Sequence, residues 1–322
     1  MSRTKLYKLS NTLIGFLIGA AACWYLLTVF QERASEFNLT EIKTHLKSSS
    51  NIFLVVLLLM PFNWGIEVLK WRTLVQEVSK VSYWQAIRSV LFGVSLSLLT
   101  PNRLGELGGR LLYIPRTDHL KVLYVNTLCS FSQLMITVVI ALIMLPYFPF
   151  EFGMAKNLLW TLIIVLLALL FYIYFSSTLV KRLISKINNR FQFRKLESLV
   201  KIPKHSRLRT LLFSTLRYAI FLGQFSLLFQ IFDPSIPLQT AILASGIIFF
   251  VSTLIPTAWI SDLAVRTSAA FIIMEHLGYS GSAALISSLL LWAINLFFPA
   301  LLGLFEFRKV NWVQLKSFGR AD

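Results

Sequence analysis

Apolar runs of about 20 residues, separated by short polar segments, recur along the whole chain of 322 residues. A helix rises 1.5 Å per residue, so about 20 apolar residues cross the ~30 Å hydrocarbon core of a bilayer. Helices also satisfy their own backbone hydrogen bonds in lipid. The pattern therefore predicts an all-α polytopic membrane protein with about six spanning helices. The predicted spans are residues 10–30, 51–69, 120–145, 157–175, 210–232 and 282–305.

Two further apolar stretches, residues 84–114 and 239–276, are each interrupted by a proline. Pro101 divides the first stretch and Pro256 divides the second. Proline has no amide donor and disfavours helix at the residue before it, so each helix should end there and restart a few residues later. The pieces that follow the prolines are too short to span a bilayer. We therefore expect two re-entrant helical hairpins.

The two interrupted stretches also resemble each other in their charges. Glu106 and Arg110 follow the first proline, and Asp262 and Arg266 follow the second, with a spacing of four in both pairs. Residues four apart lie on one helical face and can form an ion pair. Each hairpin stands between two spanning helices, so the pattern indicates an inverted repeat, which commonly forms a substrate site near the bilayer midplane. We expect a single domain, residues 1–322, with repeat units at about 51–145 and 210–305.

Basic residues are distributed unevenly among the polar segments. The chain holds 31 Lys and Arg against 14 Asp and Glu, a balance that in a soluble protein would suggest nucleic-acid binding. Here 22 of the basic residues fall in alternate segments, and the four segments between them hold 4. Cytoplasmic segments of membrane proteins carry such an excess. We predict cytoplasmic termini, hairpins that enter from opposite sides, no nucleic-acid partner, and a location in a bacterial plasma (inner) membrane. The basic-rich segments are 1–9, 70–83, 115–121, 306–322 and the cytoplasmic loop 177–209.

The sequence offers little that indicates catalysis. It has no recognisable Ser-His-Asp set, no paired carboxylates suited to acid–base work in an outer loop, and no spacing typical of a metal site. Cys23 and Cys129 both lie inside apolar runs, so we expect neither a disulfide nor a metal ligand. We therefore predict a protein that is not an enzyme and that needs no cofactor and no metal.

Charged residues inside apolar segments form the candidate site. A charge at the centre of a bilayer costs roughly 2.5–3.5 kcal/mol on insertion scales, so it usually faces a partner, water or substrate. A guanidinium fork matches the geometry of phosphate. Carboxylates can hold these guanidinium groups or contact a cationic head group. An open alternative is that the two acid–Arg pairs only hold the hairpins in place. The predicted substrate-binding residues are Glu67, Pro101, Asn102, Arg103, Gly105, Glu106, Arg110, Arg217, Pro256, Asp262 and Arg266.

Other polar and aromatic residues have more modest interpretations. Asn126 and Gln133 lie seven residues apart, on one face of a predicted span. Glu67 could pair with Lys70 or with an arginine of the first hairpin. Trp71, near the end of its helix, is typical of an aromatic belt at a membrane surface.

The residues around the first proline resemble a motif of a known family. Thr100–Arg110, Thr-Pro-Asn-Arg-Leu-Gly-Glu-Leu-Gly-Gly-Arg, is similar to the Pro-x-x-x-Gly-Glu motif of the lysylphosphatidylglycerol synthase transmembrane region, a flippase-like family. Asn63–Trp71 and Ile255–Arg266 are also similar to it, although Asp262 stands where the family commonly has Glu. In two-domain members, the resemblance implies, this region moves aminoacylated phospholipid between leaflets. We expect the stand-alone form, without the aminoacyl transferase domain.

Three functions remain in view. The favoured one is a membrane lipid transporter or flippase-like protein that binds or moves a phospholipid or a polyprenyl-linked head group. The first alternative is a non-catalytic accessory subunit of a cell-envelope lipid or glycan synthesis system, whose partner would be an envelope-synthesis enzyme. The second alternative is a membrane-embedded transferase.

Overall fold

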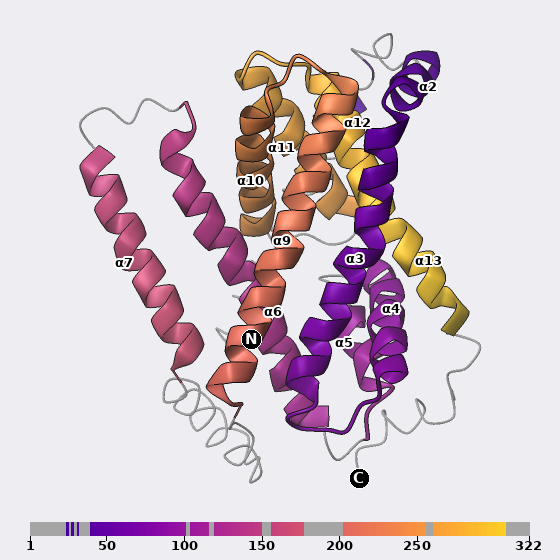
Figure 1. The fold of residues 1–322 in the computed structure, drawn as a ribbon, viewed down its shortest axis with the longest axis vertical. Coiled ribbons are helices and arrows are strands. Elements are labelled where there is room, and N and C mark those ends of the chain that lie inside the picture. The colour runs from indigo at the N-terminus through magenta and orange to yellow at the C-terminus, as the bar shows by residue number, and fades with distance from the viewer. Residues whose placement is uncertain are drawn as a thin grey trace, which may run out of the picture.

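The computed structural model describes residues 24–25, 27–28, 31, 39–100, 104–115, 119–149, 156–176, 202–255 and 260–306. Within these ranges the regular elements are helices, and no strand occurs among them (Figure 1). In chain order they are α2 (Leu39–Ser48), α3 (Ser50–Val75), α4 (Tyr83–Leu99), α5 (Leu104–Leu111), α6 (His119–Met144), the 3-10 turn η4 (Leu145–Tyr147), α7 (Lys156–Phe175), α9 (Lys204–Phe232), α10 (Leu238–Leu254), α11 (Ile260–His276), α12 (Gly281–Trp292), the π-helical turn η7 (Ala293–Phe297) and α13 (Phe298–Leu304). The predicted all-α class is confirmed for the described residues.

Four helical segments are long and apolar enough to cross a membrane, and they match four of the predicted spans. They are Ser50–Val75, Lys121–Tyr147, Lys204–Phe232 and Gly281–Leu304. The predicted span at 10–30 lies mostly outside the described residues. Helix α7, at the predicted span 157–175, is represented by the shorter apolar stretch Trp160–Phe175. The first and fourth predicted spans therefore stay predictions.

Both interrupted stretches break where the prolines indicate. Helix α4 ends at Leu99, and Thr100 is extended, with φ −127° and ψ 140°, before α5 begins. Helix α10 ends at Leu254, and Ile255 is likewise extended, with φ −97° and ψ 110°. The α4–α5 hairpin occupies the lower half of the bundle in Figure 1, whereas the α10–α11 hairpin occupies the upper half. The two hairpins thus approach the middle of the molecule from opposite ends.

Close backbone contact holds the first hairpin together. A Cβ added to Gly109 of α5 would lie 2.6 Å from the Cα of Gly93 in α4, and one added to Gly105 would overlap the carbonyl of Leu96. Lipid tails are as apolar as leucine, so helices in a membrane associate through such van der Waals packing at small residues. These glycines bring α4 and α5 to a separation that no larger residue permits.

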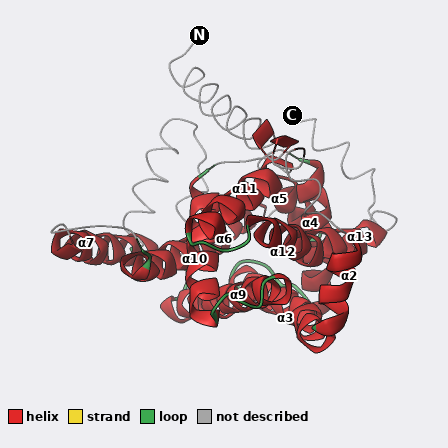
Figure 2. Cartoon of the chain, turned by 90° about the horizontal axis from the view of Figure 1, so that it is seen from above, coloured by secondary structure: helices red, strands yellow, loops and turns green. Residues whose placement is uncertain are grey.

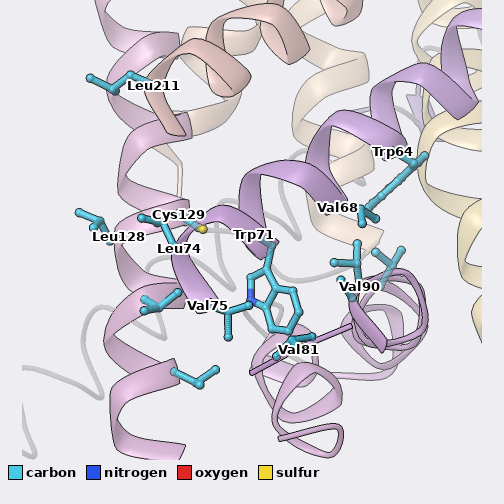
Figure 3. Packing of buried hydrophobic residues seen from close by; sticks show 14 of the residues in the cluster. Trp64, Val68, Trp71, Leu74, Val75, Val81, Val90, Leu128, Cys129 and Leu211 are labelled. Carbon is cyan, nitrogen blue, oxygen red and sulfur yellow. The ribbon is translucent and has the colours of Figure 1, made fainter. Parts of the chain in front are cut away.

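Two large apolar clusters hold most of the buried hydrophobic side chains, and a small third one contains Phe271 and Leu285. The first surrounds Trp71 of α3 and includes Val90 of α4, Cys129 of α6 and Leu211 of α9 (Figure 3). The second lies among α9, α10, α11 and α12, and includes Phe225. Trp71 is fully buried, so its predicted place in a membrane-surface belt is wrong. The reason is that its face of α3 packs against neighbouring helices.

Helix α7 stands at the edge of the bundle, where it packs beside α6 (Figure 2). Its apolar side chains are largely exposed, including Leu162, Ile164 and Val165. An exposed apolar face of this kind suits contact with lipid tails.

Candidate functional site

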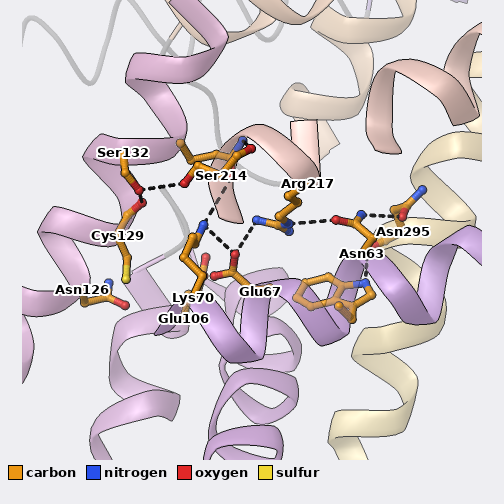
Figure 4. Close-up of polar contacts among 12 residues, drawn as sticks. Asn63, Glu67, Lys70, Glu106, Asn126, Cys129, Ser132, Ser214, Arg217 and Asn295 are labelled. Atoms are coloured by element: carbon orange, nitrogen blue, oxygen red, sulfur yellow. Dashed lines mark hydrogen bonds and ion pairs between the residues drawn. The ribbon is translucent and has the colours of Figure 1, made fainter. Parts of the chain in front are cut away.

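Glu67 is the centre of a buried network of charges. Its side chain is only 3% exposed, and its two oxygens accept from three cations. Arg110 Nη2 lies 2.8 Å from Oε1, while Arg217 Nη1 lies 2.8 Å and Lys70 Nζ 2.7 Å from Oε2. These side chains come from α3, α5 and α9, which converge here, and Figure 4 shows the α3–α9 part of the network. One carboxylate therefore joins three helices.

The polar stripe of α3 follows helical periodicity. Asn63, Glu67 and Lys70 are spaced four and three residues apart, so they lie on one face, and all three are buried. The predicted pairing of Glu67 with Lys70 or with an arginine of the first hairpin is confirmed on both counts. Lys70 Nζ also donates to Gln133 Oε1 of α6, at 3.3 Å.

Arg110 of α5 is the most completely enclosed cation of the network, at 1% exposure. Its Nη2 contacts Glu106 Oε1 at 2.6 Å, as the spacing of four predicts, as well as Glu67. Its Nη1 donates to Asn126 Oδ1 of α6 at 2.8 Å, and its guanidinium lies 5.8 Å from the centre of the Trp71 ring. Glu106, Asn126, Glu67 and Trp71 thus hold the guanidinium from several sides.

Arg217 of α9 is held more openly, at 14% exposure. Besides Glu67, it contacts Asn63, because its Nε donates to Asn63 Oδ1 at 3.0 Å. Its guanidinium also lies 5.2 Å from the Trp64 ring centre and 5.4 Å from that of Phe221. Such cation–π contacts orient the fork and leave part of it accessible.

A chain of side-chain amides continues the network away from Arg217. Asn63 Nδ2 donates to Asn295 Oδ1 at 3.0 Å, and Asn295 Nδ2 donates to Gln224 Oε1 at 3.0 Å. Asn295 lies in the π-helical turn η7, four residues before Pro299, which has no amide to offer its carbonyl. Trp64 Nε1 donates to that carbonyl instead, at 3.1 Å. Sequence reasoning missed Asn295, although an Asn four residues before Pro299 inside an apolar helix was an available signal.

The second hairpin carries a smaller and more open pair. Arg266 Nη2 lies 3.1 Å from Asp262 Oδ2, as the spacing of four predicts, and the two side chains are 19% and 24% exposed. The Arg266 guanidinium lies 5.9 Å from the centre of the Phe249 ring of α10.

Two adjoining cavities flank Arg217. The first chamber, of about 460 Å³, is lined mostly by residues of α3, α5, α6 and α9, including Glu67, Lys70, Glu106 and Arg110. The second chamber, of about 410 Å³, is lined mostly by residues of α9 to α12, including Asp262 and Arg266. The residues that line both are Trp64, Gln133, Thr137, Arg217 and Thr253. Arg217 therefore stands in the wall between a chamber of the first hairpin and a chamber of the second.

The predicted site residues divide into three groups. Six of them line the chambers: Glu67, Glu106, Arg110, Arg217, Asp262 and Arg266. Gly105 packs against α4 instead, and its amide donates to Thr100 Oγ1 at 2.6 Å. The remaining four lie outside the described residues: Pro101, Asn102, Arg103 and Pro256.

The chemistry available in the chambers is that of guanidinium, ammonium and amide donors beside aromatic rings. Within the described ranges, no group of three or more His, Cys, Asp or Glu comes together as a set of metal ligands. Guanidinium groups bind phosphate and carboxylate through paired hydrogen bonds. The arrangement is suited to binding an anionic group.

Comparison with models of known protein families identifies the family of this chain. The model of the family described as the lysylphosphatidylglycerol synthase TM region matches residues 12–303, and the chain therefore belongs to this family. With four apolar helices of spanning length, it is an integral membrane protein. No curated protein and no solved structure matches the chain.

Proposed function

We propose that this family member binds the head group of a phospholipid or polyprenyl-linked lipid in its two chambers and moves it between leaflets. The observation that carries the proposal is the position of Arg217, which lines both chambers. A phosphate held by one guanidinium fork can pass to the next without losing charged partners, which would otherwise cost several kcal/mol in the membrane. The lipid tails stay in the bilayer through a lateral opening.

We further propose that the two hairpins are re-entrant and form the halves of an inverted repeat. Their positions in opposite halves of the bundle support this (Figure 1). The paired spacing of acid and arginine supports it too, since both Arg110 and Arg266 follow an acid by four residues. In such repeats the substrate site lies at the interface of the halves, near the midplane.

The orientation that we propose places both termini in the cytoplasm of a bacterial plasma membrane. The junction between α3 and α4 and the start of α9 lie at one end of the bundle and carry basic residues such as Lys80 and Lys204. The α9–α10 and α11–α12 junctions lie at the other end and carry none. Basic segments favour the cytoplasmic side.

The role that we propose is binding and transport without covalent chemistry, so it needs no cofactor. An accessory role beside an envelope-synthesis enzyme is the second candidate, because the exposed apolar face of α7 could receive a partner helix as well as lipid. If Glu106 and Arg110 serve only as a brace, that second role gains weight.

Leaflet exchange of fluorescent phospholipid and polyprenyl-phosphate probes in proteoliposomes tests the proposal. The native protein should accelerate exchange, and Arg217→Gln should reduce the rate at least about tenfold, since it removes the fork shared by the chambers. Arg209→Gln is the matched control, because Arg209 is exposed on the same helix. Exchange that is no faster than in empty liposomes, together with co-purification of an enzyme, would support the accessory role instead.

A further inference from the structure

The charges that line the two chambers do not cancel. Three carboxylates face four cations, and in their usual ionised forms they sum to +1. The carboxylates are Glu67, Glu106 and Asp262, and the cations are Lys70, Arg110, Arg217 and Arg266. An uncompensated charge in a low-dielectric interior is unfavourable, so the chambers attract a counter-charge of the opposite sign.

The chain segments that connect the arms of the two hairpins do not supply that counter-charge. Residues 101–103 contain Arg103 and no acid, and residues 256–259 contain no charged residue. These two segments therefore contain no acid that could offset the positive charge.

The carboxylates already have cationic partners. Glu67 accepts from three cations at 2.7–2.8 Å, while Glu106 and Asp262 hold Arg110 and Arg266 at 2.6 and 3.1 Å. A cationic group such as a lysyl ammonium would have to displace one of these guanidinium groups, and it would raise the charge of the chambers. A phosphate oxyanion would instead bring the balance to zero.

The unused hydrogen-bonding groups point to the same class of ligand. Four buried side-chain atoms beside the chambers have no hydrogen-bond partner among the described residues, and all four can donate. They are Arg110 Nε, Tyr218 Oη, Arg266 Nε and Trp292 Nε1. Buried donors without partners are unfavourable, and an acceptor satisfies them. Phosphate and sugar oxygens are acceptors of the kind that these donors lack.

We infer that the chambers select lipids whose head group carries a net negative charge, with the phosphate oxyanion held between Arg217 and Arg266, and that they discriminate against cationic aminoacyl lipids. This inference rests on the proposed function, because it names the class of head group that the chambers take. The phosphate could belong to a glycerophospholipid or to a polyprenyl phosphate, which share the recognised chemistry.

Competition in native mass spectrometry of the full chain tests the inference. The probes are phosphatidylglycerol, polyprenyl monophosphate, phosphatidylethanolamine and lysyl-phosphatidylglycerol at equal concentration. At least one of the two anionic lipids should occupy the protein at least about tenfold more than the lysyl lipid, since like charges in a desolvated site repel. Preference for phosphatidylglycerol would identify a glycerophospholipid as the source, and preference for the polyprenyl phosphate would identify the other. Equal or greater occupancy by the lysyl lipid would overturn the inference.

Three variants test whether the charge of the chambers determines the lipid preference. Arg266→Gln brings the chamber charge to zero and should remove most of the anionic preference, whereas Arg266→Lys keeps the charge and should retain it. Arg209→Gln, which removes an exposed charge from α9, should retain it as well. If Arg266→Gln keeps the full preference, selection by chamber charge is wrong.

Leaflet exchange of the same lipids separates this inference from the transport proposal. Anionic lipid that binds preferentially but does not cross would contradict transport and leave charge selection standing. Lipids of every charge that bind and cross equally well would contradict charge selection and leave transport standing.

Discussion

Arg110 in the first hairpin and Arg266 in the second occupy the same place in their sequence pattern, four residues after an acid, yet their surroundings differ. Arg110 is 1% exposed and contacts side chains of three helices. Arg266 is 19% exposed, and its described contacts are Asp262 and the ring of Phe249. The backbones differ in two ways as well. In the first hairpin, α4 and α5 pack closely at glycines. The arm that follows the break is also shorter there, with 8 residues in α5 against 17 in α11.

The difference in burial suggests that the two hairpins have different roles, one rigid and one adaptable. Breaking a buried ion pair by removing one partner costs several kcal/mol, and Arg110 contacts two carboxylates and Asn126, so the first hairpin is a fixed element. A partly exposed pair can exchange partners with little change in free energy, so under the proposed transport function the second hairpin is the one that would receive and release the head group. Arg217 lines both chambers and so lies between the first hairpin and the second.

Replacing each arginine in turn is the most direct test of the difference between the two hairpins. Arg110→Gln should lower the free energy of unfolding by about 3–5 kcal/mol, because it takes a cation from two carboxylates in the interior. Arg266→Gln should lower it by less than about 1 kcal/mol. Unfolding in mixed micelles with increasing SDS measures both. Equal losses would show that the two hairpins are equally rigid.

Two neighbouring glycines of α5 test whether close backbone packing holds the first hairpin together. Gly109→Ala should destabilise the protein by about 1–3 kcal/mol, because the new Cβ would press on the backbone of Gly93, which cannot move aside. Gly108→Ala, on the exposed side of the same turn, has nothing within 4 Å of its new Cβ. It should be neutral or stabilising by up to about 1 kcal/mol through helix propensity.

The same SDS titration measures both glycine variants. If the alanines at positions 108 and 109 act alike, close packing of α4 on α5 does not hold the first hairpin. The second hairpin supplies a further reference in Gly246, whose new Cβ would meet the flexible side chain of Met144 rather than backbone. Gly246→Ala should therefore cost less than Gly109→Ala.

Local chemistry explains what could be predicted from the sequence. The breaks at Thr100 and Ile255 follow from the prolines after them, and the Glu106–Arg110 pair follows from the helical spacing of four. Asn126 could be noticed as an uncharged polar residue inside an apolar run, although its contact with Arg110 was not predicted.

Convergence over long sequence separations could not be predicted. Glu67 and Arg217 are 150 residues apart, and Asn63 and Asn295 are 232 apart, so their contacts depend on how α3, α9 and the η7 turn pack. The burial of Trp71 has the same origin, because an aromatic residue near a helix end fits either a membrane surface or a helix interface.

A further prediction concerns the residues that follow α5 at the end of the first hairpin. The Tyr113 hydroxyl donates to Glu306 Oε2 at 3.0 Å, which ties the residues after α5 to the end of α13. Tyr113→Phe should lower the free energy of unfolding by about 1 kcal/mol at neutral pH. Tyr279→Phe, which alters a partly buried tyrosine at the outer end of the second hairpin, is the matched control and should change it by less than about 0.5 kcal/mol.

The Tyr113 contact should also depend on pH, with a sign that can be worked out. Burial, and then the hydrogen bond to Glu306, raise the pKa of Tyr113 above its usual value. The folded protein therefore keeps the phenol proton at a pH where the unfolded chain, with a pKa of about 10, has begun to lose it. The contribution of Tyr113 to stability is fully present below about pH 10 and falls as the pH rises further. Native protein and Tyr113→Phe should accordingly differ most at neutral pH and converge at alkaline pH. A difference that stays constant from pH 7 to pH 11 would show that this hydroxyl is not held as the structure indicates.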